Sequence, residues 1–476
     1  MGNCGYQVVV VGAGPGGYVA AIRAAQLGLR TAIVERSELG GVCLNWGCIP
    51  TKALLHSAEV FRTARESSTH GVILDVPPRF DLAVAVKRSR MISAQLSQGV
   101  RGLLRKNKVT VIEGQACLLG QGRIAVDARA GEQRGQGAQK EQRELRAEHI
   151  ILATGARPRS LPGFDLNHHR IWTAREAMTP ESLPKSIVVI GAGAIGVEFA
   201  SFFATLGTEV TLLEGAGQIL PHEDEEIAAL LTRRLKTEGI TVRTNAQVDG
   251  CSDNNQGLQV HYRQGGNKAK VLAERVIMAV GIRGNIEELG LENTQVEVKN
   301  EHLVVDQWCR TAEAGVYAIG DVAGPPWLAH KASHEAVACV DHIAGLAEAH
   351  VVDPDSVPSC IYCHPQVASV GLSEATARAR GHEVAVGRFP FHASGKALTL
   401  NDSEGLVKTV FDKATGELLG AHMIGPDVTE LIGTYVTARV LESTEHELIQ
   451  AMFPHPTLSE ALHESVLAAF DRPLHI

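Results

Sequence analysis

Two glycine-rich turns, each placed between a predicted strand and a predicted helix, indicate an α/β protein with two tandem Rossmann-like dinucleotide-binding domains. After Pro354 the pattern changes to predicted strands followed by predicted helices, which indicates a C-terminal α+β domain. The chain has 476 residues, of which 45% are hydrophobic and 21% are charged. This composition is typical of a globular protein, and the length corresponds to about three domains of ~150 residues.

Charge and hydropathy argue against several classes of protein. The net charge of −8 gives no sign of the clustered basic surface that nucleic-acid binding needs, and no apolar run reaches the ~18–20 residues of a membrane span. A predicted strand at residues 7–11 begins near the N-terminus without a signal or transit segment, so we expect a cytoplasmic protein. The nine cysteines are scattered and odd in number, which argues against a structural disulfide framework.

The first dinucleotide unit has the order strand, glycine turn, helix and strand, at residues 7–11, 12–17, 18–27 and 31–35. Gly12, Gly14 and Gly17 give the spacing G-x-G-x-x-G, and Glu35 ends the second strand. Glycines at these positions let backbone N–H groups approach a pyrophosphate at the start of a helix, and the acid can accept a hydrogen bond from a ribose hydroxyl. The flanking strands, helix and acid make this signal much stronger than the three glycines alone.

The second unit repeats this order over residues 187–213. Its turn contains Gly191, Gly193 and Gly196, and Glu214 follows its second strand. A carboxylate at this position favours the free ribose 2′-hydroxyl of NAD and repels the 2′-phosphate of NADP. Two such units in one chain indicate two different dinucleotides.

Cys43 and Cys48 lie five positions apart in a segment crowded with glycines. In a regular helix their Cα atoms would be about 8.5 Å apart, whereas a disulfide needs roughly 4.4–6.8 Å. If the two cysteines bond, the helix must therefore be irregular, and Gly47 and Pro50 permit such a distortion. The alternatives are two separate buried thiols, or a metal site with two further ligands, for which no second cysteine pair is obviously matched.

The remaining pattern predicts helices at 51–68 and 82–106, strands at 109–113, 149–153 and 271–280, and, nearer the C-terminus, strands near 366–371, 384–390, 405–412 and 417–424 followed by helices near 427–441, 445–452 and 459–469. Residues 128–148 are polar and lack apolar periodicity, which predicts an exposed loop or a hairpin extension. Cys360 and Cys363 form a C-x-x-C motif, but a strand rather than a helix start is expected there. A structural role is therefore favoured over a redox role.

Eight segments spread over essentially the whole chain carry a resemblance to a known family. The two most specific are Gly40–Lys52, which contains both cysteines, and His455–Glu460. The others are Gly12–Gly17, Leu152–Gly155, Gly191–Glu198, Tyr317–Asp321, Leu328–Ala332 and His364–Gly371. Together they resemble the flavoprotein disulfide reductases, or class I pyridine nucleotide-disulfide oxidoreductases, and among these the dihydrolipoyl dehydrogenases.

The resemblance implies an FAD-binding domain at residues 1–155, an NAD-binding domain at 156–280, a return of the FAD-binding domain at 281–352 and a dimerisation domain at 353–476. For FAD it implies contacts from the first turn and from Glu35, Lys52, Gly114, Ala116, Asp321 and Ala329. For NAD it implies contacts from the second turn and from Glu198, Glu214, Val248 and Gly281. Glu198 also matches the acid that pairs with the lysine beside the flavin, and no metal site is implied.

The resemblance also implies the chemistry. Cys43 and Cys48 would form a redox-active disulfide, with Cys43 facing the substrate and Cys48 facing the flavin. His455 would be the base and Glu460 would orient it, both acting on the disulfide of the partner subunit in a homodimer. A histidine suits this task because only a thiolate attacks a disulfide and histidine titrates near neutral pH.

The implied reaction is the oxidation of protein-bound dihydrolipoamide to lipoamide with reduction of NAD to NADH. The implied partners are the lipoyl domains and core of a 2-oxo-acid dehydrogenase or glycine-cleavage complex. Phe453 stands where the family often has a second histidine, and Gln218 stands where a basic residue is usual. These two departures affect the surroundings of the base and of the NAD adenosine.

Two alternatives remain beside this interpretation. A glutathione-reductase-like enzyme has the same fold, but it normally uses NADPH, which Glu214 disfavours. A docking subunit in which catalysis is incidental would have no need of the two cysteines and His455 together.

Overall fold

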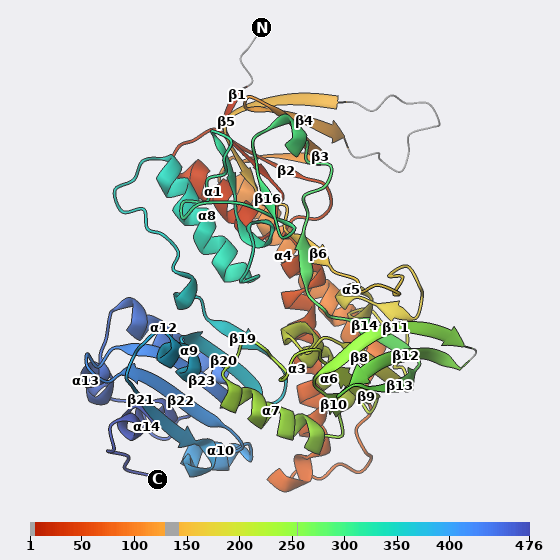
Figure 1. Cartoon of the computed structure of the whole chain (residues 1–476), viewed down its shortest axis with the longest axis vertical. Coiled ribbons are helices and arrows are strands. Elements are labelled where there is room, and N and C mark those ends of the chain that lie inside the picture. The colour runs from red at the N-terminus through yellow and green to blue at the C-terminus, as the bar shows by residue number, and fades with distance from the viewer. Residues whose placement is uncertain (1–4, 129–141, 255) are drawn as a thin grey trace. The chain divides into compact units, whose positions relative to one another are not determined.

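The computed structural model describes residues 5–128, 142–254 and 256–476, and its elements are labelled in Figure 1. The chain forms two compact units, each assembled from separate segments. The first unit comprises Met1–Leu54, Ala83–Arg159 and Ile282–Val352, and the second comprises Leu55–Leu82, Ser160–Gly281 and Asp353–Ile476. The predicted α/β class with two dinucleotide folds and a C-terminal α+β domain is confirmed.

A parallel sheet forms the centre of the first unit. Its strand order is β3-β2-β1-β5-β18, with bounds Thr110–Gly120, Thr31–Glu35, Gly5–Val11, Gln142–Leu152 and Val316–Ala318. The central parts of these strands, such as Val8–Val11, Ala32–Val34 and Ile150–Leu152, are continuous apolar runs, because a parallel sheet is covered on both faces. Side chains alternate along β1, so that Val8 and Val10 enter one hydrophobic cluster and Val9 and Val11 enter another.

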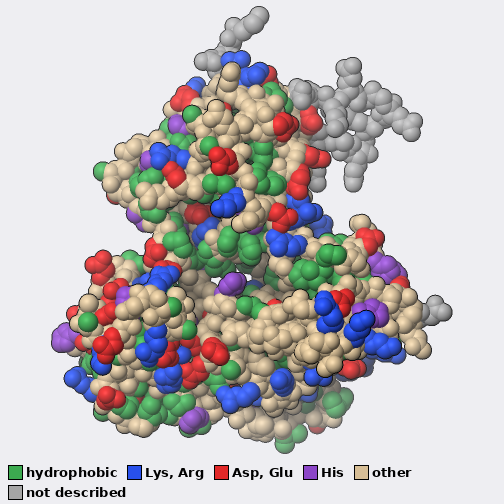
Figure 2. All heavy atoms as spheres, viewed as in Figure 1, with side chains coloured by type: hydrophobic (Ala, Val, Ile, Leu, Met, Phe, Trp, Pro, Cys, Tyr) green, Lys and Arg blue, Asp and Glu red, His purple; other side chains and the backbone are tan. Residues whose placement is uncertain are grey.

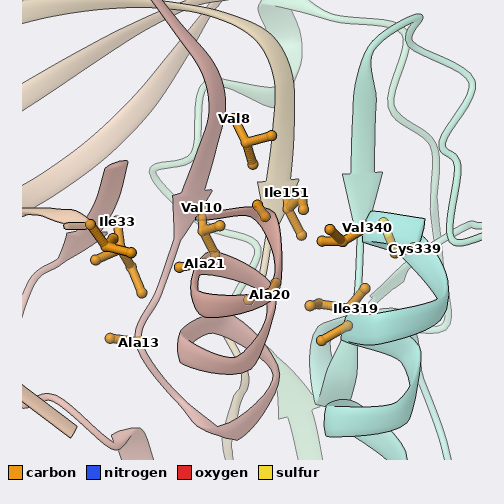
Figure 3. Close-up of a cluster of buried hydrophobic side chains, with 14 of the residues drawn as sticks. Val8, Val10, Ala13, Ala20, Ala21, Ile33, Ile151, Ile319, Cys339 and Val340 are labelled. Carbon is orange, nitrogen blue, oxygen red and sulfur yellow. The ribbon is translucent and has the colours of Figure 1, made fainter. Parts of the chain in front are cut away.

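Helices α1 (Pro15–Gln26) and α8 (Ala329–Ile343) lie side by side in this unit (Figure 1). The close-up in Figure 3 shows Val8, Val10 and Ile151 from the sheet together with Ala20, Ala21, Ile319, Cys339 and Val340 from the helical layer and its neighbouring turn. The small side chains of α1 let this helix approach the sheet closely. The first glycine turn is thereby fixed at the carboxyl end of β1.

The first unit also contains α2 (Gly41–Trp46), the start of α3 (Cys48–Arg65), most of α4 (Leu82–Lys106), the 3₁₀ turns η2 (Leu291–Asn293) and η3 (Gly320–Ala323), and the short strands β6 (Ala156–Pro158), β15 (Ile282–Gly284), β16 (Val298–Lys299) and β17 (His302–Leu303). The prediction of a helix at 82–106 is confirmed. The helix predicted from residue 51 begins earlier, at Cys48.

The outer part of β3, β4 (Arg123–Ala128) and the first half of β5 form an antiparallel extension of the sheet. Residues 142–148 of the predicted polar segment are strand, and Gln142 pairs with Asp127 of β4. The hairpin interpretation is therefore confirmed for these residues. Residues 129–141 of the same prediction lie outside the described part of the chain.

A second parallel sheet lies in the second unit. Its order is β10-β9-β8-β14-β7, with bounds Thr241–Arg243, Glu209–Leu213, Ser186–Ile190, Arg275–Met278 and Ile171–Trp172. The neighbouring helices are α5 (Ala174–Ala177), α6 (Ala194–Thr205) and α7 (Glu225–Thr237). The prediction of one strand at 271–280 was wrong, because the run is divided between two sheets. Its first part belongs to β13 (Asn267–Ala273), which pairs antiparallel with β12, and its second part is β14, which pairs parallel with β8.

The antiparallel sheet β11-β12-β13 was not predicted. Its first two strands are Ala246–Asn254 and Gly257–Gln264, which pair antiparallel. These strands are rich in polar residues, and every residue of β11 after the first is exposed or half-buried. A half-exposed strand gives only a weak apolar alternation, which explains the omission.

The C-terminal part forms an antiparallel sheet of order β19-β20-β23-β22-β21, with bounds Ser359–Ile361, Gln366–Gly371, Leu418–Gly425, Leu406–Asp412 and Val384–Pro390. Its longer helices are α12 (Gly433–Val440) and α14 (Glu460–Ala469), and its short helical elements are η4 (Pro354–Ser356), α9 (Glu374–Ala379), η5 (Phe391–Ala393), α10 (Gly395–Leu400), α11 (Val428–Leu431) and α13 (Glu445–Gln450). A further turn, η1 (Ser67–His70), follows α3. The four predicted strands and the later helices are confirmed. The short helices α9 and α10, which lie between the strands, were not predicted, and the helix predicted near 427–441 is divided into α11 and α12.

Within the described residues, every helix is too short or too polar to serve as a membrane span. On the face shown in Figure 2, Lys and Arg side chains are interspersed with Asp and Glu side chains. That mixture agrees with the totals of 45 basic and 53 acidic residues in the sequence.

Candidate active site

Cys43 and Cys48 are joined by a disulfide at the point where α2 ends and α3 begins. Gly47 separates the two helices with backbone angles of −153° and −116°, which no helix contains. The break brings the two Cα atoms to 4.7 Å, compared with about 8.5 Å in a regular helix. The predicted irregular helix is confirmed, and the interpretations as separate thiols or as metal ligands do not hold.

Glycines also position the start of α2. Gly40 and Gly41 adopt left-handed φ angles of 90° and 59°, which favour glycine. A Cβ atom on Gly41 would lie only 2.7 Å from the Cα atom of Gly14. The segment Gly40–Lys52, called the redox segment from here on, therefore begins in direct contact with the first glycine turn.

Buried polar groups hold the break. Asn45 is only 5% exposed, and its side-chain amide donates to the carbonyl oxygens of Leu39 and Gly41, both at 3.0 Å. The hydroxyl of Ser97 on α4 donates to the Asn45 side-chain oxygen at 2.9 Å. Because each buried polar group has a partner, the segment keeps this non-helical shape at little energetic cost.

Three more side chains support the same segment. Arg90 on α4 donates to the backbone carbonyl of Asn45 and lies over the Trp46 ring at 4.0 Å. The Trp46 indole N–H donates to a carboxylate oxygen of Glu38 at 2.6 Å. Sequence reasoning missed Arg90 because this residue lies 45 positions from Asn45, and nothing in the sequence marks their contact. Asn45 alone carried a signal, as a polar residue placed between the two cysteines.

The first glycine turn fits a dinucleotide. Gly12 has φ 100°, and a Cβ atom on Gly17 would lie 1.9 Å from the carbonyl oxygen of Gly12. Gly14 caps α1 without a side-chain hydrogen bond, so the first N–H groups of the helix remain available to an anion. Glu35 lies beside the turn, because one of its carboxylate oxygens accepts from the N–H of Ala13 at 2.7 Å.

Other predicted FAD contacts lie in the same unit. Gly114 and Ala116 are on β3, and Gly114 follows the residue that pairs with Glu35 at the carboxyl end of the sheet. Ala329 begins α8, and Lys52 lies one helical turn after Cys48 on the same face of α3. Three separate segments, in β3, α3 and α8, therefore carry these residues in the unit that holds the first glycine turn.

Asp321, in the turn η3, has a carboxyl group with a raised pKa. Burial raises the pKa of the Asp321 carboxyl from its ordinary 3.8 to about 6, although the nearby Lys331 ammonium opposes the shift. A buried carboxylate is stabilised by hydrogen-bond donors. The hydroxyl groups of a ribityl chain or ribose would supply such donors, so this residue fits the flavin site.

The second glycine turn has nearly the same backbone geometry as the first. Gly191 has φ 97°, and a Cβ atom on Gly196 would lie 1.9 Å from the Gly191 carbonyl oxygen. Gly193 caps α6 without a side-chain hydrogen bond. The carboxylate of Glu214 accepts from the N–H groups of Ala192 and Ala216, at 2.7 and 2.8 Å. This turn also fits a dinucleotide.

The remaining predicted NAD contacts lie around this turn in different ways. Gly281 follows β14, the strand next to β8, and has φ 103° with open space where a Cβ would be. Val248 lies on β11, whose first residue donates its N–H to the backbone carbonyl of Glu214. Glu198 is buried in α6 and accepts from the N–H of Tyr362 at 3.0 Å.

His455 and Glu460 form a hydrogen-bonded pair in the second unit. The His455 Nδ1 atom lies 2.8 Å from a carboxylate oxygen of Glu460, whose other oxygen accepts from the N–H of Thr457 at 2.8 Å. Burial by itself would raise the pKa of Glu460, but these two hydrogen bonds and the nearby imidazole lower it below its ordinary value. The His455 side chain is 79% exposed, so its Nε2 side is open to a reactant.

The helix that carries Glu460 is firmly held. The buried hydroxyl of Tyr435 donates to the carbonyl oxygen of Leu462 in α14 at 2.9 Å, and Thr409 of β22 donates to that of Ser465 at 3.1 Å. A Cβ atom on Gly387 of β21 would lie 1.7 Å from the Ser465 oxygen, so the helix packs directly on the sheet. Glu460 therefore orients the histidine from a rigid support.

Cys360 and Cys363 are not joined by a disulfide. Cys360 lies on β19, and the buried Cys363 has its sulfur 3.1 Å from the carbonyl oxygen of Pro365. The expected strand is confirmed.

Comparison with known proteins places these features in a family. Residues 6–336 match the pyridine nucleotide-disulphide oxidoreductases, and residues 357–466 match the dimerisation domain of the same family. A dihydrolipoyl dehydrogenase of Rhizobium etli is 49% identical over 99% of both chains, and one of Zymomonas mobilis is 47% identical over 99% of both. The crystal structure of LpdA from Mycobacterium tuberculosis superposes with a TM-score of 0.88 and 26% identity, covering 96% of this chain and 98% of that one. The chain therefore belongs to the pyridine nucleotide-disulphide oxidoreductases and, within them, to the dihydrolipoyl dehydrogenase family.

Proposed function

We propose that this protein oxidises protein-bound dihydrolipoamide to lipoamide and reduces NAD to NADH. The observation that carries the proposal is the Cys43–Cys48 disulfide, set in a broken helix whose first residue contacts the first glycine turn. A disulfide in this position can exchange with a dithiol on one side and lies next to a dinucleotide site on the other. The named relatives, which match along nearly the whole chain, support the same reaction.

The exchange proceeds through two thiolate attacks. A dihydrolipoyl thiolate attacks the sulfur of Cys43, which breaks the Cys43–Cys48 bond and forms a mixed disulfide with Cys43. The second lipoyl thiolate then attacks the lipoyl sulfur of that mixed disulfide, which releases cyclic lipoamide and the thiolate of Cys43. Two electrons pass from the lipoyl dithiol to the cysteine pair. His455 accepts the proton of the attacking thiol, and the proton of the second lipoyl thiol passes to the released Cys43 thiolate.

When bound, FAD would supply an electron acceptor beside the cysteine pair, and NAD would supply the final hydride acceptor. The first turn, Glu35, Lys52 and Asp321 would hold the flavin nucleotide, and the second turn with Glu214 would hold NAD. Glu214 repels a 2′-phosphate, which makes NAD the preferred acceptor.

His455 serves the disulfide of the partner subunit in this proposal. The match of residues 357–466 to a dimerisation domain supports a homodimer. The 79% exposure of His455 suits a base whose reactant is bound by another subunit. Glu460 accepts from its Nδ1 and stabilises the imidazolium that forms.

The proposed partners are the lipoyl domains and core of a 2-oxo-acid dehydrogenase or glycine-cleavage complex, and the proposed compartment is the cytoplasm. The dihydrolipoyl substrate is itself attached to such a domain, so the two proposals stand together. A pull-down with an isolated lipoyl domain, reduced and oxidised, tests the association.

The decisive assay supplies dihydrolipoamide with NAD or with NADP, and in a separate reaction oxidised glutathione with NADPH. The proposal expects rapid NADH formation, much slower NADPH formation, and negligible glutathione reduction. Cys43→Ser and Cys48→Ser should each abolish dihydrolipoamide oxidation by at least about 10³-fold, since neither can form the disulfide. Activity only with glutathione and NADPH would overturn the proposal in favour of a glutathione-reductase-like enzyme. Full binding to lipoyl domains without any turnover would favour a docking subunit.

A further inference from the structure

We propose that Arg90 is a positioning residue that sets the redox equilibrium of the Cys43–Cys48 disulfide by holding the break between α2 and α3. The inference rests on the redox role proposed for that disulfide. It adds a residue of α4 that lies 42 to 47 positions away from the two cysteines in the sequence.

Arg90 contacts the end of α2 at two points. Its Nη1 atom donates a hydrogen bond to the backbone carbonyl of Asn45, and its guanidinium carbon lies 4.0 Å from the centre of the Trp46 ring. Asn45 and Trp46 are the last two residues of α2. The last carbonyls of any helix lack partners within the helix, and here a cation satisfies one of them.

A second residue of α4 supports the same point. Ser97 donates to the side-chain oxygen of Asn45 at 2.9 Å, and Asn45 is 5% exposed. The indole N–H of Trp46 also donates a hydrogen bond to Glu38 at 2.6 Å. The end of α2 is therefore tied to α4 by groups that do not include either cysteine.

The contacts of Arg90 and Ser97 with the end of α2 have different effects in the disulfide and dithiol states. In the disulfide state the covalent bond itself holds the Cα atoms of Cys43 and Cys48 at 4.7 Å. In the dithiol state that bond is gone, and a regular helix would separate the same atoms to about 8.5 Å. Arg90 therefore opposes a relaxation that only the dithiol can undergo. This shifts the equilibrium toward the disulfide and keeps the two sulfurs close for reoxidation.

The surroundings of Arg90 are mainly polar and include Glu35, which is proposed to bind FAD. Arg90 lines a cavity of about 370 Å³ together with Glu38, Ser97 and other residues. Glu38 keeps its hydrogen bond from Trp46 when Arg90 is replaced, so Arg90→Met does not leave that carboxylate without a donor.

The experiment titrates the flavin-loaded protein with mixtures of reduced and oxidised dithiothreitol under anaerobic conditions. Reduced dithiothreitol passes two electrons and two protons to the disulfide and becomes the cyclic disulfide. The fraction of reduced Cys43 and Cys48 is then measured by alkylation and mass spectrometry. Arg90→Met should shift the half-reduction ratio toward the dithiol about tenfold, as the loss of one charged hydrogen bond suggests, which corresponds to about 30 mV.

Arg105→Met is the matched control, because Arg105 is an exposed arginine on the same helix, and its titration should equal that of the unaltered protein. Arg90→Lys should shift the ratio less than Arg90→Met, since lysine keeps the charge but not the planar group. Ser97→Ala should shift it in the same direction and serves if Arg90→Met fails to fold. Unaltered titrations of both Arg90→Met and Ser97→Ala would overturn the inference. Unaltered titrations would not contradict the oxidation of dihydrolipoamide itself. Failure of this inference can therefore be distinguished from failure of the proposed function.

Discussion

At the scale of single residues, Glu460 holds His455 in place and remains charged when it does so. Its pKa is lowered in the folded protein, so the carboxylate contributes stability above its ordinary pKa of 4.5 and loses this only as the pH falls through the lower value. The pair is therefore intact at every pH at which a thiolate can form. This makes the orientation of the imidazole independent of pH in the working range.

Glu460→Gln should lower kcat for dihydrolipoamide oxidation about 10²-fold, because the amide cannot stabilise an imidazolium. KM for NAD should be unchanged, since the second glycine turn is not involved. Steady-state kinetics with both substrates varied measures this split. Glu464→Gln removes a similar pair with His475, at 2.7 Å on the same helix, and should leave kcat unaltered. Equal losses in the two variants would mean that Glu460 acts only on stability.

Asp321 shows the opposite shift, because burial raises its pKa to about 6. Its folded form binds a proton more tightly than its unfolded form, so the flavin-free protein loses stability as the pH rises from about 4 to 6. Asp321→Asn should therefore raise the melting temperature of the flavin-free protein by about 2 °C or more at pH 8, and by less at pH 5. The same substitution should weaken FAD binding about tenfold, because the amide lacks the charge and the second acceptor oxygen of the carboxylate. Fluorimetric melting and FAD titration check the two effects, and an unchanged FAD affinity would remove Asp321 from the flavin site.

We propose that Glu214 decides between NAD and NADP. Its two oxygens already accept from Ala192 and Ala216, but a carboxylate has further lone pairs for ribose hydroxyls. Glu214→Ala should lower kcat/KM for NAD about tenfold and reduce the preference for NAD over NADP by more than that. Glu209→Ala, at the exposed start of the same strand, is the control and should change neither. A preserved NAD preference in Glu214→Ala would place the discrimination elsewhere.

At the scale of secondary-structure elements, the glycines of the two turns act by allowing close approach. Gly17→Ala would place a Cβ 1.9 Å from the oxygen of Gly12. It should lower the free energy of unfolding by about 3 kcal/mol or more and reduce flavin retention. Gly99→Ala is the same change in the interior of α4, with open space around it, and should raise the free energy of unfolding by about 0.5–1 kcal/mol. Denaturant unfolding measures both, and equal effects would contradict this account of the turn.

The sequence predicted elements well where a local rule applied. The two turns, α4 and the redox segment follow from glycine spacing, helical periodicity and the reach of a disulfide. The run 271–280 was wrong as one strand, because nothing local shows that β13 and β14 pair in different sheets. The ribbon of β11 and β12 was missed, since partly exposed strands alternate weakly.

The same limit applies to the candidate site. Cys43, Cys48, His455 and Glu460 stand in short motifs that sequence reasoning can find. Arg90 and Ser97 meet Asn45 only because α4 crosses the redox segment, with separations of 45 and 52 positions. Contacts of this kind depend on tertiary packing and have no local signature.

At the scale of the whole molecule, the proposed active site is shared between two chains. The redox pair and the first turn belong to one compact unit, and the His455–Glu460 pair belongs to the other. A match to a dimerisation domain covers the segment that carries the histidine. If each histidine serves the partner's disulfide, neither chain alone has a complete site.

A purified heterodimer of one Cys48→Ser subunit and one His455→Gln subunit tests this claim most directly. Each homodimer of either variant should be inactive in the assay with dihydrolipoamide and NAD. In the heterodimer, the intact disulfide of one subunit meets the intact histidine of the other, so two-fold symmetry predicts about half of the unaltered activity. A heterodimer as inactive as its two parents would show that His455 serves its own subunit or none, and would contradict the account.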